Sequence, residues 1–332
     1  MKQFNYQLTV SKYNFYDFRV TKLSMVIDNE GNTLDSAICN SSDWGLPSPM
    51  VIKTSKTQPL PVRVEMRWIT NIEGKCFELN APLDQEKAEE LWEKQEQNHP
   101  EDPFQQYIVG IAPYGGVAVW LCNNKRSVLL HWLHANESER TNEEQIFASP
   151  NPDMEVFTNS LLSLEKLESN MRQFKYRFFP LEEFFDGEKW KLFDNTNVYY
   201  NNIDLDTVEV KRHDGTFDYS GCDDMMRYHC QGKPQRITVR WHEDNSSYLA
   251  HFWLDDAYIM FFFDSMFNAF PEANADVLLR IDTRANRYEV AMTAEGLPVR
   301  TLAYSQFIVF REGEEICRSE YYSKKDGDWL WE

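Results

Sequence analysis

Two stretches of the chain alternate apolar and polar residues in the same way. The first is Pro61-Val-Arg-Val-Glu-Met-Arg67-Trp68 and the second is Pro234-Gln-Arg-Ile-Thr-Val-Arg240-Trp241, with the proline, both arginines and the tryptophan in identical register. Each stretch is followed by a polar turn and a second alternating run, which predicts a β-hairpin in both places. The recurrence of the whole pattern indicates an internal duplication.

A helix is predicted after each hairpin, over Asp84–Asn98 and Asp255–Phe270, and the aspartate that opens each segment suits an N-cap. In the first segment Ala88, Leu91 and Trp92 share one face and glutamates cover the rest, which predicts one buried stripe and one solvated face. The second segment is apolar nearly all round, and we expect it to be buried.

Strand-like sequence returns after each helix. The predicted strands are Gln106–Ile111, Val117–Leu121, Val277–Ile281 and Tyr288–Met292, with further strands at Phe4–Val10, Arg126–Leu133 and Leu302–Phe310. The repeat order is therefore β-β-α-β-β. It predicts an α+β fold of two related halves, built from mainly antiparallel sheets that are each covered by a helix.

The 332 residues suit two domains of ordinary size. A polar stretch, residues 135–154, precedes an apolar-periodic and helix-like segment, residues 156–171. We expect a first α+β repeat over residues 1–150, a helical connector over 151–175 and a second α+β repeat over 176–332.

The formal net charge is −19, with 15 basic and 24 acidic residues up to Asn170 and 19 and 29 after it. An acidity spread in this way repels nucleic acid backbones and anionic membranes and attracts basic partners. The first residues lack the apolar core of an export signal, and the six cysteines lack paired spacings. We therefore expect a cytoplasmic protein with reduced thiols.

The segment Gln106-Tyr-Ile-Val-Gly-Ile-Ala-Pro-Tyr-Gly-Gly-Val-Ala-Val-Trp-Leu121 places a glycine-rich turn between two apolar strands. With the preceding proline and tryptophan strand, it resembles the bacterial family of domain of unknown function 2931, most strongly over Pro59–Trp132. The resemblance implies no assigned activity and no catalytic residues. Members often look like exported lipoproteins, whereas this sequence shows no leader and no lipobox cysteine. Some relatives are encoded beside secreted antibacterial toxins, which implies an immunity role.

No catalytic signature is present, so we expect no enzyme activity, no catalytic residue and no cofactor. Cys222, His229 and Cys230, with His213 upstream, have spacings that do not suit a metal site. Arg63 and Arg67, like Arg236 and Arg240, lie on one face of an alternating strand; they could form an anion-binding row, but pairing with acidic neighbours across the sheet is the favoured interpretation.

Three stretches are strongly acidic: Asp84–Asp102, Glu137–Glu155 and Asp204–Asp224. Such runs usually form solvated faces, but the third mixes aspartates with tyrosines, a mixture that favours a protein interface. The candidate partner-binding residues are Asp204, Asp206, Asp214, Asp218, Tyr219, Asp223, Asp224 and Tyr228.

These observations lead to the hypothesis of a non-catalytic protein that binds a basic protein partner, possibly a toxin domain, and neutralises it by occlusion as a cytoplasmic immunity protein. Neither nucleic acid nor a membrane is an expected partner. The alternative is a carbohydrate- or small-ligand-binding β-rich module, because the chain holds 10 tryptophans and 16 tyrosines that could provide stacking platforms. An enzyme of unrecognised type would need a deep pocket with convergent polar groups.

Overall fold

A computed structural model gives the fold. It describes residues 2–13, 16, 18–28, 30–35, 44–47, 57–141, 163–185, 198–201, 205–220, 227–282, 287–294, 300–302 and 306–319. The chain divides into two compact units. Unit 1 comprises Met1–Met171 together with Asp214–Phe217, and unit 2 comprises Arg172–His213 together with Asp218–Glu332.

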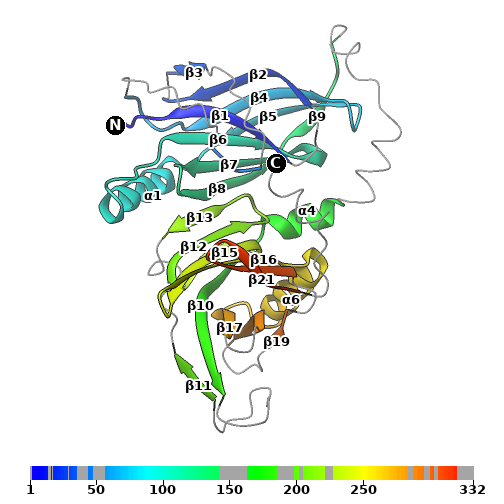
Figure 1. Cartoon of the computed structure of the whole chain (residues 1–332). Helices are drawn as coiled ribbons and strands as arrows, with labels where there is room; N and C mark the ends of the chain where they lie inside the picture. The colour runs from blue at the N-terminus through cyan, green and yellow to red at the C-terminus, as the bar shows by residue number, and fades with distance from the viewer. Residues whose placement is uncertain are drawn as a thin grey trace. The chain divides into compact units, whose positions relative to one another are not determined.

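Unit 1 contains strands in two sheets, ordered β1-β6-β7-β8 and β3-β2-β4-β5-β9 (Figure 1). The strands are β1 (Gln7–Lys12), β2 (Phe18–Val26), β3 (Thr33–Asp35), β4 (Arg63–Thr70), β5 (Lys75–Pro82), β6 (Gln106–Ile111), β7 (Gly116–Cys122), β8 (Arg126–His134) and β9 (Asn136–Ser138). The helices are α1 (Gln85–Asn98), the short 3-10 helix η1 (Pro113–Gly115) and α4 (Leu164–Met171).

Unit 2 also contains two sets of paired strands, ordered β13-β12-β15-β16-β20-β21 and β11-β10-β17-β18-β19, and β14 also pairs with β10. The strands are β10 (Gln173–Phe185), β11 (Val198–Asn201), β12 (Leu205–Arg212), β13 (Phe217–Ser220), β14 (His229–Gly232), β15 (Pro234–Glu243), β16 (Ser246–Trp253), β17 (Ala275–Asp282), β18 (Arg287–Ala294), β19 (Arg300–Thr301), β20 (Gln306–Arg311) and β21 (Glu314–Arg318). Helix α6 spans Asp256–Ala269.

The two units repeat the same strand pairings. In unit 1, β1 pairs with β6 in parallel, and antiparallel pairs join β2 to β4, β4 to β5, β5 to β9, β6 to β7 and β7 to β8. In unit 2, β10 pairs with β17 in parallel, and antiparallel pairs join β12 to β15, β15 to β16, β16 to β20, β17 to β18 and β18 to β19. All six pairings recur in the same order along the chain, so unit 2 has the topology of unit 1.

Local details recur as well. The Asp84 and Asp255 side chains cap the two helices by accepting from the backbone N–H three residues on, at 2.9 Å in both cases. Trp68 stacks on Phe77 of the neighbouring strand, and Trp241 stacks on Tyr248 in the same way, with ring centroids 5.4 and 5.1 Å apart. Pairs of this kind stabilise a hairpin across its strands. The duplication is therefore visible in side-chain packing as well as in sequence.

The predicted fold class is wrong. The five predicted elements are present in each half, but the described residues are mostly strand, the sheets are mixed, and the helices do not each cover an antiparallel sheet. The two hairpins of each half enter different sheets. One 14-residue helix such as α1 buries only Ala88, Trp92 and Gln95. That stripe is too small to cover the apolar face of a sheet, so the two sheets must cover one another.

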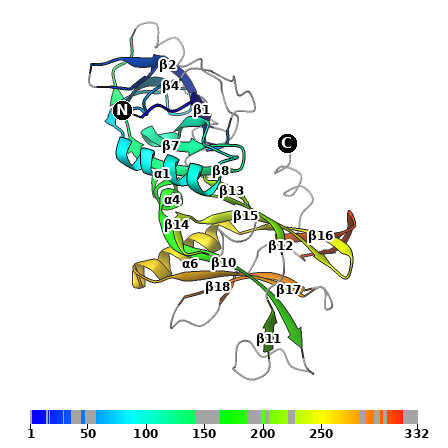
Figure 2. The same cartoon turned by 90° about the vertical axis from the view of Figure 1, so that its left-hand side faces the viewer.

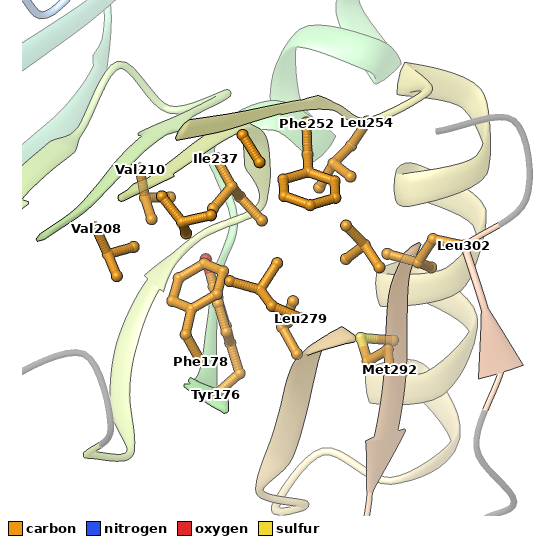
Figure 3. Packing of buried hydrophobic residues seen from close by; sticks show 14 of the residues in the cluster. Tyr176, Phe178, Val208, Val210, Ile237, Phe252, Leu254, Leu279, Met292 and Leu302 are labelled. Atoms are coloured by element: carbon orange, nitrogen blue, oxygen red, sulfur yellow. The ribbon is translucent and has the colours of Figure 1, made fainter. Parts of the chain in front are cut away.

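The core of each unit lies between its two sheets. In unit 1 the side chains of Met66, Trp68, Val109 and Val119, from β4, β6 and β7, belong to one buried cluster. In unit 2, side chains from both sheets point into one core, including Tyr176 and Leu279 from one sheet and Ile237 and Phe252 from the other (Figure 3). The buried stripe of α6, with Phe263, belongs to the same cluster, and α6 runs between strands of the two sheets (Figure 2).

Strands β6 and β7 are buried on both faces, since all their residues are buried. One face meets the core between the sheets. The other meets a second cluster that includes Trp44, Trp120, Leu167 of α4 and Phe217. The near-continuous apolar sequence of these strands, which interrupts the usual alternation, follows from this double burial.

Stability is predicted to depend on pH through His251, which is 4% exposed on β16 and has Nδ1 3.0 Å from Thr238 Oγ1. Burial, with the positive charges of Arg236 and Arg240, lowers its pKa from 6.5 to about 4. Because the folded pKa lies below the unfolded one, the contribution of neutral His251 to the free energy of unfolding is fully present above pH 6.5. It is lost as the pH drops toward 4, by about 3 kcal/mol in all.

His251→Asn places at this position the residue that unit 1 has at the matching one, Asn80, opposite Glu65 as His251 is opposite Thr238. Urea unfolding at several pH values between about 7 and 4 is expected to show a much shallower loss of stability in H251N than in the unmodified chain. Equal slopes in the two proteins would contradict this role for His251.

Candidate functional site

The eight predicted partner-binding residues do not form one surface. Asp204, Asp223 and Asp224 lie outside the described residues. Asp206, Tyr219 and Tyr228 are exposed, but Asp214 and Asp218 are buried, at 0% and 8% exposure. Asp214 belongs to unit 1, whereas Asp206, Asp218, Tyr219 and Tyr228 belong to unit 2. The buried pair cannot present carboxylates to a partner in this structure.

Asp214 holds a turn inside unit 1. Its Oδ1 accepts hydrogen bonds from the backbone N–H and the hydroxyl of Thr216, at 3.0 and 2.6 Å, and its backbone oxygen accepts from Trp120 Nε1 at 3.1 Å. The next residue, Gly215, has φ +80° and packs so tightly that a Cβ on Gly45 would lie 2.1 Å from its carbonyl oxygen. An aspartate two residues before a threonine is the signal of such a turn, and here it identifies a structural residue.

Asp218 is bound to buried Arg212, whose Nη2 donates to Asp218 Oδ2 at 2.7 Å and to Gln231 Oε1 at 2.6 Å. Tyr228 is bound on the surface. Its hydroxyl donates to Asp276 Oδ1 at 2.8 Å, and the guanidinium of Arg177 lies over its ring, 4.6 Å from the centroid. The exposed Tyr228 side chain is therefore held by the Arg177 guanidinium against its ring and by the Asp276 carboxylate at its hydroxyl.

The paired arginines behave as the favoured interpretation predicts at two of the four positions. Arg67 Nη1 lies 3.2 Å from Glu78 Oε2, directly across the β4–β5 hairpin, and Arg236 Nη2 lies 3.0 Å from Glu209 Oε1 on neighbouring β12. Pairing with acidic neighbours is thus confirmed for Arg67 and Arg236.

In the described part of the chain, no three His, Cys, Asp or Glu side chains are close enough to hold a metal ion. Of the four residues weighed in the sequence, Cys222 lies outside the described residues and His229 Nδ1 is 2.9 Å from the backbone oxygen of Arg227. Among the described residues, no helix is long and apolar enough to cross a membrane.

Glu73 is a partly buried carboxylate in unit 1 that the sequence did not single out. Burial raises its pKa, and both its oxygens accept hydrogen bonds, Oε2 from the Tyr16 hydroxyl and Oε1 from the Tyr114 backbone N–H at 2.9 Å. Tyr114 has φ +61°, which is uncommon for a residue other than glycine. With both oxygens engaged, the arrangement holds the glycine-rich turn and ties the β4–β5 hairpin to the β6–β7 hairpin.

A second buried charge network surrounds Lys233 in unit 2. This lysine is fully buried, its Nζ lies 3.2 Å from Asp264 Oδ2, and burial lowers its pKa while Asp264 opposes the shift. Arg172 donates to Asp264 Oδ1 and to Asn268 Oδ1, both at 3.0 Å. A lysine with a lowered pKa is a candidate nucleophile, but one with no exposed surface cannot reach a substrate. The network secures α6 to the residues that directly precede β15 and β10.

Helix α6 carries a feature that its sequence did not predict. Its buried stripe is Ile259, Phe263 and Phe267, yet Phe261 is 68% exposed and Phe270, just after the helix, is 48% exposed. The expectation that the whole helix is buried is therefore wrong, because the two sheets cover only one side of it. Its outward side adds aromatic residues to the surface of unit 2.

Removing the carboxylate of Asp264 leaves the buried Lys233 without its counter-charge. Asp264→Asn is expected to lower the free energy of unfolding by about 3 kcal/mol, because an uncompensated buried charge is costly. Lys233→Met in the same chain is expected to restore most of the loss, since it removes the charge and keeps the volume. Urea unfolding of both variants checks this, and a double variant no more stable than D264N would contradict it.

Comparison with known proteins identifies a family for the part of the chain that contains unit 1. A family model described as a protein of unknown function, DUF2931, matches residues 1–174, more than half of the 332-residue chain. The range includes the turn that Glu73 holds. Neither a curated protein nor a solved structure gives a significant match. The chain belongs to the DUF2931 family of proteins of unknown function.

Proposed function

We propose that this protein binds a basic protein partner without catalysing a reaction, and that it acts in the cytoplasm as an immunity protein that neutralises a secreted bacterial toxin by occlusion. The observation that carries the proposal is the presence of exposed aromatic side chains on the surface of unit 2 of a chain whose net charge is −19. Acids steer a basic partner, and aromatic anchors provide the contact.

The fixed side chain of Tyr228 supports a binding role. Tyr228 is fixed between Arg177 and Asp276, so little of its rotamer freedom remains to be lost when a partner binds. Tyr219 is 44% exposed, and Asp206 and Tyr219 are carried by neighbouring strands, β12 and β13. These residues are what remains accessible of the predicted acidic and aromatic surface in the described part of the chain.

Occlusion requires a surface, whereas an enzyme requires reactive groups that a substrate can reach. Three ionisable groups whose pKa is shifted by burial serve the fold: Glu73 holds a turn, Lys233 is sealed within unit 2, and His251 is buried on β16. Their placement supports a role without chemistry. The same acidity that attracts a basic protein disfavours nucleic acid and anionic membranes as partners.

A carbohydrate-binding role gains no support from the tryptophans. Those in the described residues are Trp44, Trp68, Trp92, Trp120, Trp132, Trp241 and Trp253, of which Trp132 is half-buried and the others are buried. A stacking platform needs exposed ring faces, which these side chains do not offer.

Affinity purification of the tagged, full-length chain from its native host, at low and high salt, tests the proposal. We expect one stoichiometric protein of basic isoelectric point that is retained at low salt and lost at high salt, because screening weakens attraction between exposed charges. Mass spectrometry identifies it. A chain that elutes alone in both conditions, or with an acidic partner unaffected by salt, would contradict the proposed function.

A further inference from the structure

The outward side of α6 is an aromatic surface. It consists of Tyr258, Phe261 and Phe262 on the helix and Phe270 just beyond its end. Phe261 and Phe270 are 68% and 48% exposed, and Tyr258 stacks on Phe262 with ring centroids 5.5 Å apart. Phe261 and Phe262 follow Tyr258 by three and four residues, so these three side chains are neighbours on the helix surface, and Phe262 also packs against the core. Phe270 follows the last turn of the helix. We call this set the α6 face.

The matching helix of unit 1 shows that folding does not require these aromatic residues. Helices α1 and α6 both have 14 residues, both begin after a capping aspartate, and both end with a backbone N–H bound four residues back. At the matching outward positions α1 has Glu90 where α6 has Phe261, and Lys94 where α6 has Ser265. Lys87 likewise matches Tyr258, whereas Leu91 matches Phe262 and both pack against their cores. The same fold is therefore built once with charged and once with aromatic residues at the positions of Tyr258 and Phe261.

Single exposed apolar residues are ordinary, but a cluster of them on one side of an element marks an interaction site. The surroundings of the α6 face indicate the partner's chemistry. Carboxylates lie at both ends, Asp255 and Asp256 at the start of the helix and Glu272 beyond Phe270, with Asp255 and Glu272 exposed. Cations near the helix are engaged, since Arg172 and Lys233 are bound to Asp264.

We propose that the α6 face is the docking surface for an apolar segment flanked by lysine or arginine on a basic protein. The inference rests on the proposed function and assigns the surface that carries it. Charge complementarity selects this occupant over a second copy of the chain, because a second copy would bring its own carboxylates and a net charge of −19 against the same charges.

A defined probe tests the surface without the natural partner. The full-length chain is titrated by calorimetry with a synthetic amphipathic peptide that has a leucine face flanked by lysines, and with a matched peptide that has glutamates in place of the lysines. The lysine peptide is expected to bind and the glutamate peptide is not. Phe261→Glu is expected to weaken binding about tenfold or more, as for an anchor at the centre of an interface.

Two controls complete this experiment. Glu90→Gln, on the matching side of α1, is expected to leave affinity unchanged. Phe261→Ala, which adds no charge, is expected to lower affinity in the same direction as F261E, with thermal unfolding unchanged in both because the side chain is exposed. Equal binding of the lysine peptide by F261E, F261A and the unmodified chain would overturn the proposal. So would a dimer, by light scattering, that F261E converts to a monomer, because the occupant would then be a second copy.

Failure of this inference is distinguishable from failure of the proposed function. If the unmodified chain and F261E retain the same basic protein from the host equally well, the function stands and the α6 face is not its docking surface. If the unmodified chain retains no basic protein, the proposed function fails, and the peptide titration alone decides the chemistry of the face. Loss of the basic protein in F261E but not in E90Q supports both.

Discussion

The fold depends on the parallel pairing of each unit's first strand with the strand that follows its helix. Strand β6 has β1 on one side and β7 on the other, and β17 has β10 and β18. With both edges of β6 and β17 occupied, the hairpin before the helix cannot pair with the strand that follows the helix, and it pairs instead with β2 or β12. Two facing sheets result, with the helix as the connection between them, and the apolar sides of both hairpins meet in one core.

Because both units have the same strand pairings, their differences can be compared position by position. Unit 1 uses Glu73 to hold a strained glycine-rich turn, and unit 2 uses Asp264 to hold a buried lysine and an arginine. Both devices place charge inside the fold, where it must be matched. The exposed positions of α1 and α6 carry no such charge network, and there the two copies differ, with Glu90 at the position of Phe261.

Much of the local structure could be predicted from the sequence. Both hairpins, both long helices and their capping aspartates follow from short-range patterns. The parallel pairs could not be predicted, because Gln7 and Gln106 are partners far apart in the chain and no local signal joins them. Burial of Asp214 and Asp218 was equally hidden, since an aspartate in a turn and one on a surface have the same neighbours in sequence. The exposure of Phe261 was missed because an apolar helix predicts burial, whereas only contact with the sheets decides which side is covered.

Unit 2 is a second copy of the unit 1 fold, and its helix turns an aromatic side outward. A crystal structure of the full-length chain, with the two units superposed on one another, tests it most directly. We expect β10 to lie parallel to β17 as β1 does to β6, the Trp68–Phe77 and Trp241–Tyr248 stacks to coincide, and Phe261 to occupy the place of Glu90. A second unit with β10 antiparallel to β17, or with Phe261 buried within its own core, would contradict it.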